Sequence, residues 1–247
     1  MRIALTSWGF PTPYSRSMNG IASYTARTAK AMTQLGHDVT VITSHADGMP
    51  DHYQTEEGVQ VYQAAKRNIH WYLSKLPLFS GRVITYVKLL DTWQPVIHKL
   101  LHLGHQFAYD VVEVSPPIPA IFPTLGRSLN TTVVSTLHGS ALLPYQDLSI
   151  KPTLLDRLWG FAEQRAAHIA DCLASPSQHV ASFYQHAYGS TPHVISLPVE
   201  QFHYPKQSGL NLKILALGGT GIAKGSDILI PAALEDVITE NNMQNIQ

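Results

Sequence analysis

The residues best suited to chemistry form a glycine-rich turn at positions 218–225, which reads GGTGIAKG. The turn follows an apolar stretch, Leu212–Leu217, and precedes a helix-like stretch, Ser226–Ile238. Backbone N–H groups between a strand and a helix can cradle a phosphate, and Lys224 adds a positive charge there. The spacing fits neither a dinucleotide fingerprint, whose third glycine is replaced by Lys224, nor a P-loop, which needs the order Gly-Lys-Ser/Thr.

A second candidate is the loop after the apolar stretch Arg2–Ser7, which ends in Asn19-Gly20 where a helix is expected to begin. In open α/β sheets, ligands bind beyond the carboxyl ends of the strands. A glycine there lets a ligand approach the free N–H groups of the helix start, which favour an anion. The same glycine could instead serve only to permit a turn, and both interpretations stay open.

His138 is the third candidate, because it directly follows the apolar stretch Thr131–Leu137. A histidine at the carboxyl end of a strand can donate to a substrate hydroxyl or stabilise a developing charge. A histidine satisfied by loop contacts is the alternative. The position of His138 favours a functional role more than that of any other of the 13 histidines.

The elements that position these residues alternate between strand and helix. Arg2–Ser7, a helix over Ile21–Leu35 that Gly36 ends, and a strand over Asp38–Thr43 form a βαβ unit, which predicts a parallel sheet. Further strands are expected at Val59–Gln63, Tyr109–Ser115, Thr131–Leu137, Cys172–Ser175 and His193–Leu197. Further helices are expected at Phe79–Leu103, which Pro95 should kink or divide, after Pro116, at Leu154–Ala170 and at Gln178–Tyr188.

This alternation predicts an α/β fold with a Rossmann-like, doubly wound parallel sheet over residues 1–205. Tyr204–Gly209 is typical of a linker, and residues 206–247 begin a second domain with one βα unit. A single βα unit cannot bury both of its faces, so we expect the second domain to be incomplete.

Composition excludes several classes of protein. The 17 basic and 17 acidic residues cancel, which argues against a general nucleic-acid binder. The single cysteine, Cys172, excludes a disulfide framework and a cysteine-based metal site, and it suits a reducing cytosol. No stretch approaches the ~20 apolar residues of a spanning helix, and the N-terminal apolar run is too short for a secretion signal. A cytoplasmic protein is expected.

The stretch from Lys66 to His105 is locally basic and aromatic. Its basic residues are Lys66, Arg67, Lys75, Arg82, Lys88 and Lys99, opposed by Asp91 alone, with Trp71, Tyr72, Phe79, Tyr86 and Trp93 interleaved. A basic, aromatic helix fits a lipid acceptor or the inner face of a membrane. A solvated helix with buried aromatic side chains explains the same residues, and both interpretations stay open.

Taken together, these segments resemble family 4 of the retaining glycosyltransferases, which have the GT-B fold of two facing Rossmann-like domains. The segment NGIASYTARTAKAMTQLGHDVTVIT is similar to the family's opening glycine loop, helix and strand. YDVVEVS and STLHG are similar to two later strands, the second of which ends in histidine. FAEQRAAHIADCLASPSQHV, VISLPVEQFHYP and KILALGGTGIAKGSDILIPAA match further family segments in the same order. The resemblance implies an N-terminal, acceptor-side domain and the start of a donor-binding domain.

The resemblance also implies an activity. The family transfers a sugar from a nucleotide-sugar donor to a glycan or lipid-linked acceptor, with retention and without a required metal or other cofactor. By this resemblance His138 lies beside the transferred sugar as the catalytic candidate, and Gly20, Gly219 and Lys224 contact the donor diphosphate. Gly219 stands where the family has a diphosphate-binding arginine, so one cation is missing, and Asn19 replaces the first glycine of the loop.

The family's Glu-x₇-Glu motif, which holds the donor, lies beyond the segments that match. We therefore expect a truncated form of a glycosyltransferase. A catalytically inactive acceptor-binding half that needs a partner chain for the donor site is the first alternative. A nucleotide-binding α/β protein that uses the 218–225 turn is the second.

Overall fold

The computed structural model describes residues 1–12, 20–65, 67–76, 81–115 and 129–198. Nearly all of them belong to one compact unit, formed by Met1–Tyr145 and Lys151–Val199. The predicted linker and βα unit lie outside the described residues. The division into residues 1–205 and 206–247 therefore stays a prediction.

The first three elements form the predicted βαβ unit. The strands β1 (Arg2–Ser7) and β2 (Asp38–Thr43) pair in parallel, and α1 (Gly20–Gln34) connects them. Gly36 follows α1 with a φ of 84°, a left-handed conformation that suits glycine. Its N–H donates to the carbonyl of Thr33, which closes the last turn and ends the helix as expected.

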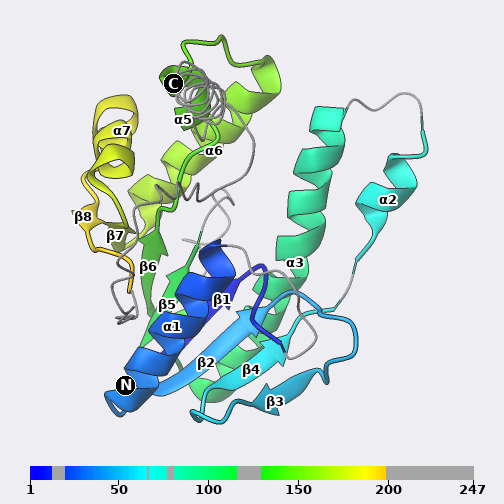
Figure 1. Cartoon of the computed structure of the whole chain (residues 1–247), viewed down its shortest axis with the longest axis vertical. Coiled ribbons are helices and arrows are strands. Elements are labelled where there is room, and N and C mark those ends of the chain that lie inside the picture. The colour runs from blue at the N-terminus through cyan, green and yellow to red at the C-terminus, as the bar shows by residue number, and fades with distance from the viewer. Residues whose placement is uncertain (13–19, 66, 77–80, 116–128, 199–247) are drawn as a thin grey trace, which may run out of the picture. The chain divides into compact units, whose positions relative to one another are not determined.

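Eight strands form one sheet in the order β3-β4-β2-β1-β5-β6-β7-β8 (Figure 1). Neighbouring strands are parallel, except that β3 pairs with β4 in the antiparallel direction. The remaining strands are β3 (His52–Gln54), β4 (Gln60–Gln63), β5 (Val111–Val114), β6 (Thr132–Thr136), β7 (Cys172–Ser175) and β8 (His193–Val194). Because the chain places further strands on both sides of β1, the sheet is doubly wound, as predicted.

The remaining described helices are α2 (Ile69–Leu73), α3 (Gly81–Phe107), α5 (Leu143–Asp147), α6 (Leu154–Ile169) and α7 (Gln178–Tyr188). None of the described helices combines the length and the apolarity that crossing a membrane requires. A capping box starts α6, in which the side chains and backbone N–H groups of Thr153 and Asp156 bond reciprocally. The Tyr86 hydroxyl donates to Asp156 at 2.7 Å, and this bond ties α3 to α6.

Alternate side chains of β1 enter two different apolar layers. Ile3 and Leu5 pack with Ala29 of α1, whereas Ala4 packs with Trp93 and other residues of α3. Helices therefore cover both faces of the sheet around β1, as expected for a parallel sheet. A third cluster joins α6 and α7 to the strands β6 and β7.

Two predicted elements differ from the structure. The helix α3 continues through Pro95, so of the two predicted effects of this proline the division is wrong, and the kink stays a prediction. Its neighbours Trp93 and Val96 are fully buried, and their burial offsets the hydrogen bond that proline cannot make. The last strand was predicted to reach Leu197 but ends at Val194. Its partner β7 ends at Ser175, because Pro176 has no N–H with which to continue the ladder.

Candidate functional site

His138 lies at the carboxyl edge of the sheet, two residues after β6 ends. Its Nε2 is 3.5 Å from the Oγ of Ser115, the residue that follows β5. The ring of Tyr24, from α1, meets the imidazole edge-on with the centroids 4.7 Å apart. Tyr24 lies one helical turn from Gly20, so the fold brings the start of α1 and His138 to the same place.

Gly20 begins α1 and is exposed. Its φ lies outside the left-handed region, so the backbone conformation does not require glycine. A Cβ built on Gly20 would meet no atom of the described residues within 4 Å, so their packing does not require glycine either. The described residues therefore give no structural reason for glycine at this position, and the contact of Gly20 with a ligand stays a prediction.

A buried carboxyl group, Glu113 of β5, is linked to His138 through Tyr24 and was not recognised in the sequence. Its Oε1 accepts hydrogen bonds of 2.7 Å from the hydroxyls of Tyr24 and Thr136. A signal was present, since Glu113 is a charged residue in the middle of the apolar strand YDVVEVS. A carboxyl group in such a strand needs polar partners, because burial without them is costly.

Burial sets the charge states around His138. It lowers the pKa of His138 to about 4, since a charged imidazole there would lose its contact with water. Burial likewise raises the pKa of Glu113, although the hydrogen bonds from Tyr24 and Thr136 oppose this shift. At neutral pH, His138 is therefore uncharged and can accept one hydrogen bond and donate another, which suits it to orient a sugar hydroxyl.

The loop after His138 is held by a second buried carboxyl group, Glu163 of α6. Glu163 accepts hydrogen bonds from the Ser140 hydroxyl at 2.6 Å and from the Ala141 N–H at 3.0 Å. The Tyr188 hydroxyl donates to it at 3.4 Å. Burial raises the pKa of Glu163, although these hydrogen bonds oppose the shift. Glu163 therefore holds the side chain of Ser140 and the backbone of Ala141, two and three residues beyond His138.

A cleft of about 500 Å³ that has charged residues in its lining lies at the same edge of the sheet, where β1, β2 and β4 end beside α3. We call it the basic cleft. It is lined by Trp8, Ser44, His45, Ala65, Arg67, Asn68, Thr85, Lys88, Leu89, Asp91 and Thr92. Arg67 and Lys88 supply its permanent positive charges, and both are exposed.

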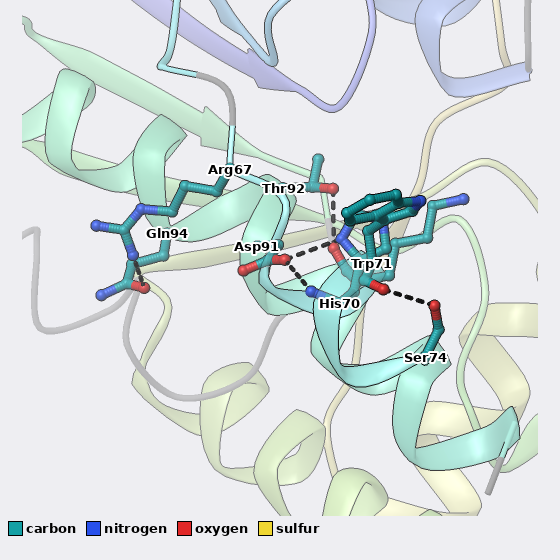
Figure 2. Close-up of polar contacts among 8 residues, drawn as sticks. Arg67, His70, Trp71, Ser74, Asp91, Thr92 and Gln94 are labelled. Atoms are coloured by element: carbon teal, nitrogen blue, oxygen red, sulfur yellow. Dashed lines mark hydrogen bonds and ion pairs between the residues drawn. The ribbon is translucent and has the colours of Figure 1, made fainter. Parts of the chain in front are cut away.

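The acidic residue in the described lining of the basic cleft, Asp91, is already engaged. Its Oδ2 accepts hydrogen bonds from the backbone N–H of His70 at 2.7 Å and from the His70 ring at 2.9 Å. Figure 2 shows these bonds, and it shows Arg67 lying to the side with its guanidinium bonded to Gln94 at 2.5 Å. Asp91 therefore anchors α2 to α3 and leaves Arg67 without a carboxylate partner among the described residues.

The predicted basic and aromatic stretch divides into two parts. Trp93 is fully buried, and Tyr86 packs its ring 4.6 Å from Trp159, as the interpretation with buried aromatics requires. Trp71 and Tyr72 of α2 are exposed by 50% and 66%. The ammonium group of Lys75 lies 3.5 Å from the centroid of the Trp71 ring. An exposed aromatic and basic surface therefore exists at α2, next to the basic cleft.

A second hollow, of about 450 Å³, lies between α1 and the face of the sheet. Its lining is mostly aliphatic and includes Ile3, Leu35, Ile195 and Leu197. Glu113 is its acidic residue, and no cationic side chain contributes to the described lining. This hollow is poorly suited to a phosphate group, whereas the described lining of the basic cleft carries two cationic side chains.

The sequence-predicted diphosphate residues Gly219 and Lys224 lie outside the described residues. Their contact with a diphosphate stays a prediction. Among the predicted site residues, the structure therefore brings together His138 and Gly20.

Comparisons with known proteins agree with this architecture. One solved structure, sucrose-phosphate synthase from Thermosynechococcus elongatus, is similar with a TM-score of 0.58 at 17% identity. The match covers 79% of this chain and 47% of that chain, so this chain spans less than half the length of that protein. A second structure of the same synthase gives a TM-score of 0.52 at 14% identity, covering 81% of this chain and 90% of that chain.

These likenesses show the fold, which is that of a GT-B glycosyltransferase domain. No curated protein matches the sequence significantly. Residues 18–200, well over half of the chain, match the model of Glycosyltransferase Family 4. The chain therefore belongs to Glycosyltransferase Family 4.

Proposed function

We propose that this chain provides the acceptor side of a glycosyltransferase that transfers a sugar from a nucleotide-sugar, with retention, to a glycan or lipid-linked acceptor. The observation that carries the proposal is the uncharged, half-buried His138 at the carboxyl edge of the sheet, beside the start of α1, in a family 4 chain. We propose a cytoplasmic location for this activity.

The chemistry of sugar transfer gives His138 and the start of α1 their proposed roles. Transfer breaks the bond between the anomeric carbon and the diphosphate and forms a new bond to an acceptor oxygen. The neutral imidazole of His138 hydrogen-bonds a hydroxyl of the transferred sugar and orients its anomeric carbon. The N–H groups at the start of α1, beside Gly20, stabilise the departing diphosphate, and Lys224 and the backbone at Gly219 add to this stabilisation. These roles need no metal ion.

A second candidate function is that of an acceptor-binding half, which requires a partner chain to complete the donor site. The observation that favours it is the sequence at Gly219, where a glycine replaces the family's diphosphate-binding arginine. The loss of one cation weakens the stabilisation of a departing diphosphate.

The proposed acceptor includes lipid-linked molecules, because of the surface at α2. Ile69, Trp71, Tyr72 and Leu76 are exposed there, and Lys75 lies beside them. Aromatic and basic side chains together suit the interface of an anionic membrane. We propose peripheral contact with a membrane through this part of residues 66–105.

The proposal is tested by incubating the purified chain with radiolabelled nucleotide-sugars and measuring transfer and hydrolysis. We expect activity that His138→Ala abolishes and that His186→Ala, on the exposed face of α7, retains. NMR of the first-formed product reports retention. Activity that appears only with an added donor-domain chain would favour the second candidate. Absence of activity under both conditions would contradict an enzymatic role.

A further inference from the structure

The basic cleft has a charge pattern that the proposed sugar transfer does not explain by itself. Arg67 and Lys88 are exposed at its wall, and within the described part of the chain neither forms an ion pair. The carboxylate of Asp91 is oriented toward His70, with a ring nitrogen 2.9 Å away. The Arg67 guanidinium donates to the neutral amide of Gln94. Two cationic residues therefore line a cleft in which the carboxylate of the described lining, Asp91, is already bonded.

Trp8, which lines the same cleft, carries a donor without a partner among the described residues. The indole Nε1 of Trp8 is buried, and no described residue accepts its hydrogen bond. A buried donor that lacks a partner costs free energy, so we expect a buried water, or a small movement of the indole toward a bound group, to satisfy it. Asn68 and Thr85 add an amide and a hydroxyl to the lining.

We propose that the basic cleft binds a phosphate group carried by the acceptor, with Arg67 and Lys88 as the charged ligands. A phosphate monoester carries a charge of about −1.5 to −2 at neutral pH, which matches two cations. A single carboxylate would satisfy only one of them. Guanidinium and ammonium groups form strong, charge-assisted hydrogen bonds to phosphate oxygens. This inference rests on the proposed function, because it takes the bound molecule to be the acceptor.

The position of the cleft fits this assignment. The basic cleft lies at the ends of β1, β2 and β4, and His138 follows β6 at the same edge. Three strand spacings of ~4.8 Å separate β2 from β6, which places the two sites roughly 15 Å apart. An acceptor with its phosphate in the cleft therefore extends along the carboxyl edge toward His138.

Tryptophan side chains offer a direct test. The chain has four tryptophans, and Trp8 is the one that lines the basic cleft. Inorganic phosphate and glycerol 3-phosphate are titrated into ¹⁵N-labelled protein, with glycerol as the unphosphorylated control and Trp8→Phe to assign the indole signal. We expect both phosphates to shift the Trp8 signal and glycerol to leave it unchanged.

Substitutions locate the binding. We expect Arg67→Gln and Lys88→Gln each to weaken binding roughly ten-fold or more, since each removes a charge-assisted contact. Arg165→Gln and Lys151→Gln remove exposed charges outside the cleft and should leave binding unchanged. Equal melting temperatures establish that the variants are folded. Phosphate binding that neither Arg67→Gln nor Lys88→Gln weakens overturns the proposal. A Trp8 signal that no soluble phosphate shifts also overturns it, unless the vesicle experiment below shows binding that depends on the cleft.

A vesicle experiment identifies the source of the phosphate. Sedimentation with phosphatidylcholine vesicles that contain phosphatidic acid is compared with sedimentation with phosphatidylcholine alone. Vesicle binding that Arg67→Gln weakens and Arg165→Gln does not supports a lipid-borne phosphate, whereas binding of soluble phosphates alone supports a soluble acceptor. Phosphate binding at the cleft without any sugar transfer would support this inference and contradict the proposed function. Sugar transfer that does not depend on Arg67 or Lys88 would support the proposed function and contradict this inference.

Discussion

The phenol ring of Tyr24 meets the imidazole of His138 edge-on, with the ring centroids 4.7 Å apart. Its hydroxyl donates at 2.7 Å to the buried Glu113, which also accepts from Thr136, two residues before His138. Tyr24 therefore contacts His138 with its ring and, through Glu113, holds the strand that carries His138. One side chain of α1 couples the helix start at Gly20 to the predicted catalytic histidine.

Removing the Tyr24 hydroxyl tests this coupling. Tyr24→Phe keeps the ring and leaves Glu113 with one of its two hydroxyl donors, so we expect a loss of about 1–3 kcal/mol in the free energy of unfolding. Urea denaturation measures it. Tyr72→Phe, at an exposed position of α2, is the matched control and should change stability by less than about 0.5 kcal/mol. Equal effects of the two substitutions would show that Glu113 does not depend on Tyr24.

The low pKa of His138 predicts a pH dependence of stability. Because burial lowers this pKa to about 4, the unfolded chain, with a histidine pKa of ~6.5, binds the proton first as the pH falls. The contribution of the neutral His138 to the free energy of unfolding is fully present above pH ~6.5 and is lost as the pH falls toward 4. Between pH 7.5 and pH 5, the titration of His138 should lower the free energy of unfolding by about 2 kcal/mol.

His138→Gln isolates this contribution. The raised pKa of Glu113 gives a slope of the opposite sign, but it is common to both proteins and cancels in their difference. We expect the wild type to lose about 2 kcal/mol more than His138→Gln between pH 7.5 and 5, by denaturation at each pH. Parallel stability profiles would mean that His138 is already charged in the folded protein at pH 5.

Gly20→Ala separates the ligand-binding role of Gly20 from a structural one. A Cβ at Gly20 meets no atom within 4 Å in the described part of the chain, and the φ of Gly20 lies outside the left-handed region. Alanine should therefore leave stability unchanged or raise it by up to about 1 kcal/mol. Where a diphosphate approaches the helix start, the added methyl group should raise the KM for the nucleotide-sugar. An unchanged KM for the nucleotide-sugar would show that Gly20 does not contact the donor.

Much of the fold could be predicted because its signals are local. The apolar runs of β1, β2 and β7 and the helix stop at Gly36 each depend on a few adjacent residues, and the structure confirms them. The short elements β3, α2 and α5 were missed, because three to five residues show no clear periodicity. Their formation depends on tertiary partners, as the bond between His70 and Asp91 illustrates.

The candidate site was less predictable. His138 and Gly20 could be proposed because they follow strands, and parallel strands end at one edge. The partners of Glu113 could not be predicted, since Tyr24 and Thr136 are 89 and 23 residues away along the chain. The basic cleft likewise joins Trp8 to Arg67 and Lys88, residues whose proximity only the packing of α3 on the sheet creates.

The loop after His138 offers the last prediction. Glu163 accepts from Ser140 and from the backbone N–H of Ala141, and it does so with both oxygens at Ala141, at 3.0 and 3.2 Å. Glu163→Gln replaces one acceptor by a donor that faces another donor, so a buried N–H or hydroxyl loses its partner. We expect a loss of about 1–3 kcal/mol in stability and faster hydrogen exchange at the Ala141 amide.

The matched control is Glu57→Gln, which removes a carboxylate that pairs with Lys30 at the exposed surface, and it should be nearly neutral. The readout that distinguishes positioning from mere stability is kinetic. If Glu163 holds His138 in place through residues 139–141, kcat falls in Glu163→Gln at temperatures where the variant is fully folded, while phosphate binding at the basic cleft is unchanged. A stability loss with normal kcat would restrict Glu163 to a structural role.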